Sequence, residues 1–431
     1  MRTIAAYTLG CKVNQYDTEA MVEAFEAAGY ASVPFQAAAD VYLINTCTVT
    51  STGDQKSLKM IRRTAREHPG SDIIVAGCLA QRDGEALSEL DGVRLVIGSA
   101  RRARVVELYE EACREDRTAV AVEPLRGAAF EALRVGRHEG KTRAVMKIQE
   151  GYDRYCSYCI IPYVRGPVRS MPLAAVREEA RRLAESGYAE IVLTGIHLAS
   201  YGRDSGESLL DAVRAAAETP GVCRVRLGSL EPKWMTRETA RILSGIPALA
   251  RQFHLSLQSG SAGVLRRMRR RYTPEEYAEA CENVRAFMPD AAVTTDIIAG
   301  FPGETEEEHR ETLAFLERTA LARLHVFPYS RREGTMADGM PGQVPEAEKK
   351  RRAAELIALG NQLELRFVQG CKGTVQTVLF ERALDGGLCE GYTGSYVRVR
   401  AEGSPGELAR VRLTGNEGTL AIGETVAQDG R

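Results

Sequence analysis

The sequence predicts an α/β fold in three parts: an N-terminal open parallel-sheet α/β domain, a central partial (β/α)6 barrel and a C-terminal small β-barrel. Apolar runs alternate with amphipathic stretches over residues 1–120, and the same pattern returns over residues 144–370. Residues 371–431 are instead rich in Gly, Thr and Val with alternating polarity, which is typical of short antiparallel strands. Residues 121–143 carry several glycines and many charges and are predicted to be a linker. A chain of 431 residues is long enough for two or three domains with their own cores.

Three cysteines share one position in the N-terminal domain, directly after an apolar run. The predicted strands of this domain are residues 3–9, 41–45, 73–76 and 93–97. Cys11, Cys47 and Cys78 follow the first three of these strands. Because ligands bind at the carboxyl ends of strands in open parallel sheets, the position predicts three thiolates at one edge. Three thiolates with an open fourth position suit an iron–sulfur cluster or zinc, and the alternative is three small buried residues.

The central part contains six further predicted strands, at residues 144–149, 191–195, 222–229, 253–258, 293–300 and 324–328. Six βα units in one domain favour a barrel or a partial barrel, whose site lies at the carboxyl ends of the strands. Polar residues and glycines gather at these predicted ends, among them Thr194, Gly195, Gln258, Asp296 and Gly300.

The loop after the first of these strands carries the only close pair of cysteines, Cys156 and Cys159. Two thiols at C-x-x-C spacing can bind one metal centre or form one small disulfide. A thiol redox protein would need a thioredoxin-like setting around the pair, and a six-unit barrel does not supply one.

Composition narrows the choice further. The net charge is −1, so no strongly basic or acidic partner is implied for the chain as a whole. No apolar run reaches the roughly 18 residues that span a bilayer, and we expect no membrane partner and a cytoplasmic location. Ten cysteines are many for a cytosolic protein, in which disulfides are rare, so metal or redox use of some of them is expected.

Eight segments together resemble one family. They are TLGCKVNQYDTE, INTCTVT, AGCLAQ, YCSYCIIPYVRG, EIVLTGIHL, FHLSLQSG, TTDIIAGFPGET and HVFPYSRREGT. In this order, over nearly the whole chain, they resemble the methylthiotransferases of the radical S-adenosylmethionine (SAM) superfamily. The KVNQYDTE continuation after Cys11 resembles the branch that methylthiolates N6-threonylcarbamoyladenosine beside the anticodon of tRNA. The alternative branch acts on isopentenyladenosine in tRNA.

The resemblance implies two [4Fe–4S] clusters and SAM as cofactors. An auxiliary cluster on Cys11, Cys47 and Cys78 would carry or donate the sulfur, and a second SAM would methylate it. A radical SAM cluster in the barrel would use one electron, from a donor such as flavodoxin or ferredoxin, to cleave SAM. The adenosyl radical so formed would abstract hydrogen from an adenine C–H, which no protein acid or base can do. No side chain is therefore assigned as a catalytic acid or base.

The resemblance also implies where SAM and tRNA bind. Glycines such as Gly195 and Gly300, with Thr194 beside them, would allow close approach of the backbone to SAM. Gln258 and Asp296 are candidates for binding the ribose or the amino-acid end of SAM. The alternative for Gln258 and Asp296 is ordinary packing within the barrel. The last domain resembles the TRAM module, an RNA-binding β-barrel, in which Arg398 and Arg400 alternate on a strand. Two basic clusters are further candidates, with a solvated surface as the alternative: Arg266, Arg267, Arg269, Arg270 and Arg271, and Lys56, Lys59, Arg62, Arg63 and Arg66.

One residue departs from the family pattern. The radical SAM loop is C-x-x-x-C-x-x-C, and this chain has Tyr152 in place of the first cysteine. A phenol with a pKa near 10 and a hard oxygen suits a sulfide-bridged cluster poorly, so the departure predicts an impaired radical SAM cluster. Three explanations are open: the chain has lost radical SAM activity, another ligand completes the site, or Tyr152 is a change in an otherwise normal enzyme. A non-catalytic tRNA-binding relative is therefore the alternative to the enzyme. The sequence leaves the oligomeric state open.

Overall fold

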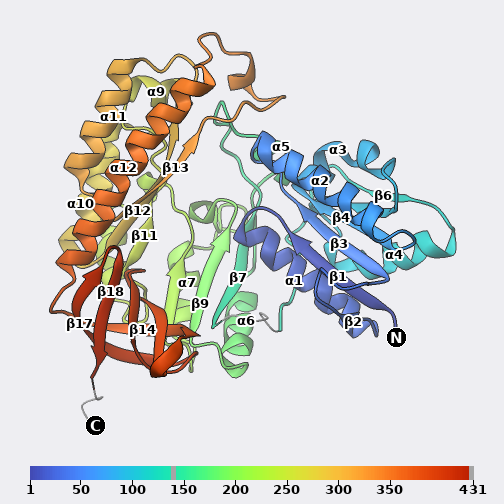
Figure 1. Ribbon diagram of the computed structural model, residues 1–431, viewed down its shortest axis with the longest axis horizontal. Coiled ribbons are helices and arrows are strands. Elements are labelled where there is room, and N and C mark those ends of the chain that lie inside the picture. The colour runs from blue at the N-terminus through green and yellow to red at the C-terminus, as the bar shows by residue number, and fades with distance from the viewer. Residues whose placement is uncertain (137–141, 427–431) are drawn as a thin grey trace.

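The computed structural model describes residues 1–136 and 142–426 and confirms the predicted α/β architecture (Figure 1). The N-terminal part is a sheet of six strands in the order β2-β1-β3-β4-β5-β6, and every pairing within it is parallel. Its strands are β1 (Thr3–Thr8), β2 (Ala31–Ser32), β3 (Val41–Thr46), β4 (Asp72–Gly77), β5 (Val93–Ile97) and β6 (Ala119–Ala121). The predicted linker at 121–143 overlaps the end of β6, and residues 137–141 lie outside the described part of the chain.

Helices cover both faces of this sheet. Met21 and Phe25 of α1 (Lys12–Ala27) and Tyr109 of α4 (Val105–Arg114) are buried in one apolar core. A second core on the opposite face contains residues of the other two helices, α2 (Ser51–Glu67) and α3 (Cys78–Ser88). Strands covered on both faces have continuous apolar sequences, and all six residues of β3 are buried.

The central part is a half-barrel of parallel strands that follow one another in sequence order. One sheet has the order β10-β9-β7-β8, and a second has the order β11-β12-β13. The two sheets meet between β10 and β11, where single bridges join residue 225 to 249 and residue 230 to 255. The strands are β7 (Arg143–Glu150), β8 (Arg169–Ser170), β9 (Glu190–Gly195), β10 (Arg224–Leu227), β11 (Gln252–His254), β12 (Ala292–Ala299) and β13 (Arg323–Pro328). Only β8 pairs antiparallel, at the edge beside β7.

The helices of the half-barrel lie on its outer side and share one large core with the strands. They are α6 (Leu173–Glu185), α7 (Leu209–Ala217), α8 (Arg237–Ser244), α9 (Ala262–Arg267), α10 (Pro274–Phe287), α11 (Glu306–Thr319) and α12 (Glu346–Gly370). The short helix α5 (Ile161–Arg165) instead packs against α3 of the N-terminal domain. Thr273 and Thr305 begin α10 and α11 with capping boxes, each closed by a glutamate in the first turn. These local signals fix where both helices start.

The alternation of β7 explains how the N-terminal domain joins the half-barrel. Ala144, Met146 and Ile148 face the outer helices, whereas Val145 packs with Tyr16 and Ala20 of α1. Helix α1 therefore lies against the inner face of the half-barrel, and the two parts are packed side by side (Figure 1).

A buried network of charged side chains lies at this contact. Asp17 of α1 forms ion pairs with Arg102, Lys147 and Arg165, and Glu150 at the end of β7 pairs with the same three cations. All five side chains are at most 2% exposed. Breaking a buried pair by removing one partner typically costs about 3–5 kcal/mol, so this network fixes the orientation of the two domains.

The C-terminal part is a closed five-stranded barrel in the order β14-β15-β16-β18-β17. Its strands are β14 (Val375–Ala383), β15 (Leu388–Thr393), β16 (Arg398–Glu402), β17 (Leu408–Glu417) and β18 (Leu420–Thr425). Val368 near the end of α12 belongs to the core of this barrel, which fixes its place at one end of the molecule (Figure 1). The closed barrel agrees with the sequence prediction.

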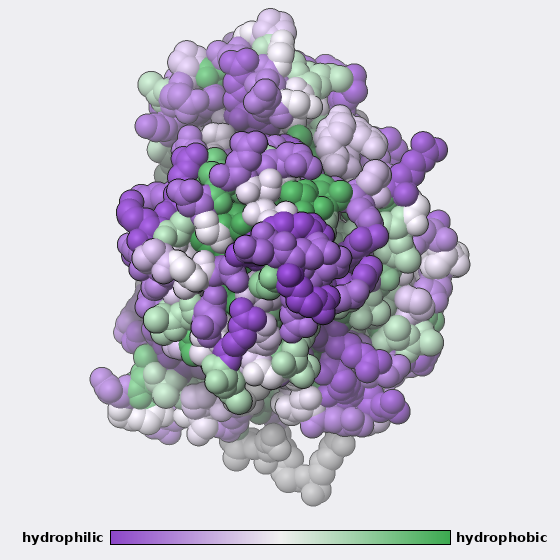
Figure 2. Space-filling model, turned by 90° about the vertical axis from the view of Figure 1, so that its right-hand side faces the viewer, coloured by the Kyte–Doolittle hydropathy of each residue, from purple (hydrophilic) through white to green (hydrophobic). Residues whose placement is uncertain are grey.

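Figure 2 shows the side of the molecule formed by the N-terminal domain, where hydrophilic residues cover most of the surface around small hydrophobic patches. No helix within residues 1–136 or 142–426 is both long and apolar enough to cross a bilayer.

Candidate active site

The structure brings the three cysteines of the N-terminal domain to one edge of the sheet, as their positions predict. Cys11 follows β1 and is exposed, Cys47 follows β3 and is half-buried, and Cys78 begins α3 and is buried. Gly10 has a φ of +107°, and a Cβ there would lie 3.1 Å from the sulfur of Cys47. Glycine at this position therefore allows the chain to bring Cys11 beside Cys47.

The three thiols influence one another electrostatically. Burial, together with the neighbouring thiols of Cys78 and Cys11, raises the pKa of the Cys47 thiol to about 11. Burial also raises the pKa of Cys78, whereas the guanidinium of Arg165 lowers it. The thiolate forms of these three cysteines need a nearby positive charge to be favoured. Bound iron would supply a larger positive charge than Arg165 does.

Arg165 connects this edge to the half-barrel. It is the last residue of α5, which follows the C-x-x-C loop, and its side chain is 1% exposed. Its Nε donates to the Sγ of Cys78 at 3.2 Å, its Nη1 donates to Oε1 of Glu150 at 2.8 Å, and its Nη2 donates to the side chain of Asn14. Ile160 and Val164 pack on Cys78 as well. The loop that carries one pair of cysteines therefore contacts the group of three directly.

The C-x-x-C loop is held at the carboxyl end of β7 by hydrogen bonds of its backbone. The amide of Ser157 donates to the carbonyl of Met268 at 3.0 Å, and the carbonyl of Ser157 accepts from Ala337 at 2.7 Å. Gly151, with a φ of +79°, lies so close to Pro167 that a Cβ would be 1.7 Å from its carbonyl oxygen. The loop position therefore requires glycine at 151, one residue before Tyr152.

Tyr152 occupies the place where the resemblance expects a cysteine. Its hydroxyl lies 3.6 Å from the sulfur of Cys156, and its ring packs against His197 with the centroids 5.3 Å apart. Burial raises the pKa of Tyr152 far above 10, and negative charge on Cys156 and Cys159 raises it further. Burial likewise raises the pKa of Cys159 to about 12. The phenol therefore stays neutral beside the two thiols and does not replace a thiolate.

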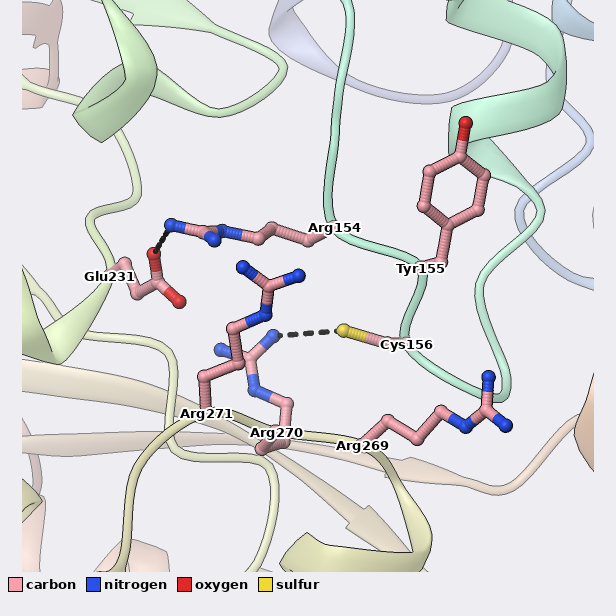
Figure 3. A pocket seen from close by; sticks show the side chains of 7 residues that line it. All are labelled: Arg154, Tyr155, Cys156, Glu231, Arg269, Arg270 and Arg271. Atoms are coloured by element: carbon pink, nitrogen blue, oxygen red, sulfur yellow. Dashed lines mark hydrogen bonds and ion pairs between the residues drawn. The ribbon is translucent and has the colours of Figure 1, made fainter.

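An arginine-rich cavity of about 270 Å³ opens beside Cys156 (Figure 3). Arg270 donates to the sulfur of Cys156 at 3.4 Å, and it also donates to the hydroxyl of Tyr272 and to the carbonyl of Ser256. Arg154, Arg269 and Arg271 surround the same space. The cavity can accept an anionic group next to the loop, because arginines outnumber carboxylates on its wall.

Among the described residues that line this cavity, Glu231 is the one carboxylate. Its Oε2 accepts from Arg154 at 3.1 Å and lies 3.5 Å from Nε2 of His197. Burial alone would raise its pKa, but the hydrogen bond with His197 and the charges of His197, Arg154 and Arg270 lower it to about 2. Glu231 therefore remains ionised and holds Arg154 and His197 in place around the loop.

The residues predicted at the strand ends fall into two groups. Thr194 and Gly195 are the last residues of β9. Gln258 lies beyond β11 and has a left-handed φ of +73°. Its backbone forms hydrogen bonds with the backbone of Asp296 and Ile298 in β12. A non-glycine residue with positive φ is strained and is often found at functional sites. Asp296 differs from the prediction: it lies inside β12, and its carboxylate is 3.3 Å from Nε2 of His254. It therefore belongs to the inner wall of the half-barrel and not to the strand end.

The two glycines show close approach, but to the protein itself. A Cβ on Gly195 would lie 2.7 Å from Oε1 of Gln149, and one on Gly300, whose φ is +72°, would lie 2.5 Å from Cγ of Lys349. Both positions need glycine because of these neighbours. Any role toward a cofactor stays a prediction.

The predicted RNA-binding arginines are not equivalent in the structure. Arg267 pairs with Glu308 at 2.6 Å and Arg270 contacts Cys156, so both have structural partners. Arg266, Arg269 and Arg271 are exposed. All five basic residues of α2 are exposed, and Arg398 and Arg400 lie on one face of β16, where Arg400 pairs with Glu417. The exposed members keep their predicted role as candidates.

Sequence reasoning did not connect several residues of the site with the cysteines. Arg165, Glu231 and His197 carry no spacing signal that connects them to a cysteine, because their contacts join segments far apart in sequence. Arg270 was assigned to RNA on the basis of its cluster alone. Arg270 is half-buried, and its guanidinium packs on the ring of Tyr272 at 4.8 Å from ring centroid to Cζ.

The cysteine sets differ in how well they fit an iron–sulfur cluster. Within residues 1–136 and 142–426, no three His, Cys, Asp or Glu side chains are grouped closely enough to bind one metal ion. A [4Fe–4S] cluster binds each thiolate through a different iron and therefore needs a wider spacing. Cys11, Cys47 and Cys78 fit such a cluster in number and chemistry. The C-x-x-C loop supplies two thiols and a neutral phenol, so it fits a three-thiolate cluster incompletely.

Two family models match the chain. Residues 3–98 match the family described as uncharacterized protein family UPF0004, and residues 146–316 match the radical SAM superfamily. Among solved structures, the chain is similar to the radical S-adenosylmethionine methyltransferase TsrM from Kitasatospora setae, with a TM-score of 0.58 and 14% identity over 87% of this chain and 77% of that chain. OxsB, a cobalamin-dependent S-adenosylmethionine radical enzyme, gives a TM-score of 0.52 at 12% identity over 84% of this chain and 56% of that chain. At these identities the likeness shows the fold alone.

Curated relatives cover nearly the whole chain. The threonylcarbamoyladenosine tRNA methylthiotransferase MtaB of Bacillus subtilis is 40% identical over 93% of this chain and 90% of its own length. The MtaB of Thermotoga maritima is 36% identical over 92% of this chain and 91% of its own length. The tRNA-2-methylthio-N(6)-dimethylallyladenosine synthase of Pelotomaculum thermopropionicum is 34% identical over 90% of this chain and 88% of its own length. With the radical SAM fold, the three cysteines at the sheet edge and these relatives together, the chain belongs to the radical SAM methylthiotransferase family, in its MtaB branch.

Proposed function

We propose that this enzyme transfers a methylthio group to C2 of N6-threonylcarbamoyladenosine beside the anticodon of tRNA. The observation that carries the proposal is the direct contact between the two cysteine-bearing segments, through Arg165 and Cys78, in a chain of the MtaB branch. Methylthio transfer needs a sulfur source and a radical source at one adenine, and this contact joins the two segments that the family resemblance assigns to them. The isopentenyladenosine branch is not favoured, because the MtaB of Bacillus subtilis has the higher identity, 40% against 34% for the dimethylallyladenosine synthase.

We assign the auxiliary cluster to Cys11, Cys47 and Cys78. A [4Fe–4S] cluster at this edge would hold the sulfur that is transferred. The chain itself positions these thiols: Gly10 brings Cys11 to Cys47, and Arg165 donates to Cys78. The cluster would also lie beside α1, whose N-terminus follows Cys11, and a helix N-terminus favours negatively charged neighbours.

We propose that the loop of Cys156 and Cys159 is the radical SAM site, and that Tyr152 weakens cluster binding in this chain. Its support is the neutral phenol that stands 3.6 Å from the sulfur of Cys156. The backbones of Met268 and Ala337 hold this loop in place by hydrogen bonds. The arginines that line the neighbouring cavity place positive charge beside the loop. A non-catalytic tRNA-binding protein is the second candidate, and Tyr152 is the observation that favours it.

SAM is proposed to bind over the carboxyl ends of the strands, near Thr194, Gly195, Gln258 and Gly300. The strained backbone of Gln258 supports this place. Asp296 is proposed to face the substrate from the inner wall, since its partner is His254.

The exposed arginines Arg266, Arg269 and Arg271 are proposed to bind tRNA phosphates, together with Arg398 on the C-terminal barrel as a TRAM-like module. Reduction requires an electron donor such as flavodoxin or ferredoxin, and because tRNA is the substrate we place the protein in the cytoplasm.

The test is an anaerobic assay of the reconstituted full chain with SAM, a reductant and tRNA that carries threonylcarbamoyladenosine. Nucleosides are then analysed by mass spectrometry. The proposal expects the methylthio form of threonylcarbamoyladenosine from the Tyr152→Cys variant and less of it from the unaltered chain. If both bind tRNA without product, while each binds its clusters, the non-catalytic candidate is correct.

A further inference from the structure

A second cavity, of about 290 Å³, lies where α1, the half-barrel and the C-terminal barrel meet. Lys12 and Gln15 of α1 form one wall, Val145 and Val192 of the half-barrel form another, and Tyr396 of the C-terminal barrel closes it. Val145 is on the inner face of β7, so this space belongs to the inner side of the half-barrel. No residue of the cavity has so far been assigned a function.

Most charges around this cavity are already paired. Arg143 forms an ion pair with Glu381 at 2.7 Å and donates to the hydroxyl of Tyr396 at 2.9 Å. Glu190 pairs with both Arg224 and Arg226, at 3.0 and 2.8 Å. These pairs leave the surroundings of the cavity cationic, because the arginines outnumber the carboxylates.

Lys12 and Gln15 are different, since neither side chain has a hydrogen-bond or ion-pair partner among the residues that the structure describes. Both line the cavity, where Gln15 is half-buried and Lys12 is exposed to solvent. They are three positions apart on α1 and therefore lie on the same face of the helix. An unpaired ammonium among arginines, beside an unpaired carboxamide, is a site for a carboxylate with a neighbouring polar group.

The position of Lys12 connects this site to the reaction. Lys12 follows Cys11 directly, so it lies next to the proposed source of sulfur. In adenine, C2 and C6 flank the same ring nitrogen, N1. An adenine whose C2 lies near Cys11 therefore has its N6 substituent only two ring positions away, within reach of a residue beside Cys11. A threonylcarbamoyl group ends in a carboxylate and a hydroxyl, whereas a dimethylallyl group has no polar atom.

We propose that Lys12 binds the threonyl carboxylate and that Gln15 binds the hydroxyl or ureido group beside it, so that the pair selects the threonylcarbamoyl nucleoside. This inference rests on the proposed function and adds the residues that read the substrate. A dimethylallyl group in the same place would leave the ammonium and the carboxamide desolvated and unpaired, which disfavours it.

The test measures binding and not turnover. The full chain is titrated anaerobically with fluorescent anticodon stem-loops that carry threonylcarbamoyladenosine, its threonyl methyl ester, dimethylallyladenosine or unmodified adenosine. A charge-assisted hydrogen bond is typically worth enough that its loss weakens binding about 10- to 100-fold. We expect Lys12→Ala to weaken binding of the first loop by that factor and to leave the other three unchanged. Lys12→Arg should retain most of the affinity, and Gln15→Ala should cause a smaller loss.

Lys350→Ala is the matched control, because Lys350 is an exposed lysine on α12, far from the cavity in sequence. Urea unfolding of each variant shows that the fold is kept. If Lys12→Ala weakens all four loops equally, or none of them, the specificity role is wrong. If the unaltered chain shows no preference for the threonylcarbamoyl loop over the unmodified one, the proposed substrate fails instead, and the two failures are thus distinguished.

Discussion

Arg165 donates a hydrogen bond from Nε to the sulfur of Cys78 at 3.2 Å, and this contact joins the end of the C-x-x-C segment to the group of three cysteines. The same guanidinium pairs with Glu150 and Asp17 inside the domain contact. Its position is therefore fixed from several sides, and the cysteine edge depends on a residue of the half-barrel.

Replacing Arg165 should change the properties of a cluster at Cys78. Hydrogen bonds and positive charge near a ligating sulfur raise the reduction potential of iron–sulfur clusters. We expect Arg165→Gln to shift the midpoint potential of the auxiliary cluster to more negative values and to alter its electron paramagnetic resonance signal. Arg169→Gln is the control, since the partners of Arg169 in the structure are the Arg165 carbonyl and Glu150 rather than a cysteine. An unchanged potential in Arg165→Gln would contradict the role of the contact.

Tyr152→Cys should restore the second cluster. A third thiol at position 152 would complete the C-x-x-x-C-x-x-C set with Cys156 and Cys159, in the loop that already holds those two thiols. Iron and sulfide are counted after anaerobic reconstitution, with about four irons for each cluster. We expect one cluster per unaltered chain and two per Tyr152→Cys chain. Two clusters in the unaltered chain would show that another ligand completes the site.

Removing Asp17 should destabilise the domain contact strongly. Asp17 is 1% exposed and pairs with Arg102, Lys147 and Arg165, so Asp17→Asn leaves buried cations without their full compensation. We expect a loss of about 3–5 kcal/mol in the free energy of unfolding, measured with urea. The exposed pair of Arg63 and Glu67 on α2 is the comparison, and Arg63→Ala should cost less than about 1 kcal/mol. Equal losses in the two variants would be incompatible with the buried network.

The stability of the protein should fall in acid partly through Glu231. Its pKa is about 2 in the folded protein and near 4.5 when unfolded, so its stabilising effect is present above pH 4.5 and is lost as the pH falls through 2. We expect the difference in free energy of unfolding between the unaltered chain and Glu231→Gln to be larger at pH 6 than at pH 3. The apo chain is used for this comparison. A difference that does not change between these pH values would show that Glu231 is not held ionised by His197 and Arg154.

The sequence predicted the parts of the site that depend on local order and missed those that depend on packing. The alternation of strands and helices placed Cys11, Cys47 and Cys78 at one edge, because the carboxyl ends of neighbouring parallel strands necessarily lie together. The predicted strand at 293–300 agrees closely with β12, but Asp296 was grouped with the strand-end residues although it lies in the middle of the strand. The proposed roles of Arg165 and Lys12 depend on the contact between α1 and the half-barrel. No local sequence pattern predicts this contact.

The most direct test of the central claim is mass spectrometry of tRNA nucleosides from bacteria that lack their own enzyme of this branch and express the Tyr152→Cys chain. We predict that the methylthio form of threonylcarbamoyladenosine appears and that a further Cys11→Ala substitution abolishes it. Threonylcarbamoyladenosine that stays unmodified, or a methylthio group found on dimethylallyladenosine instead, would contradict the assigned reaction.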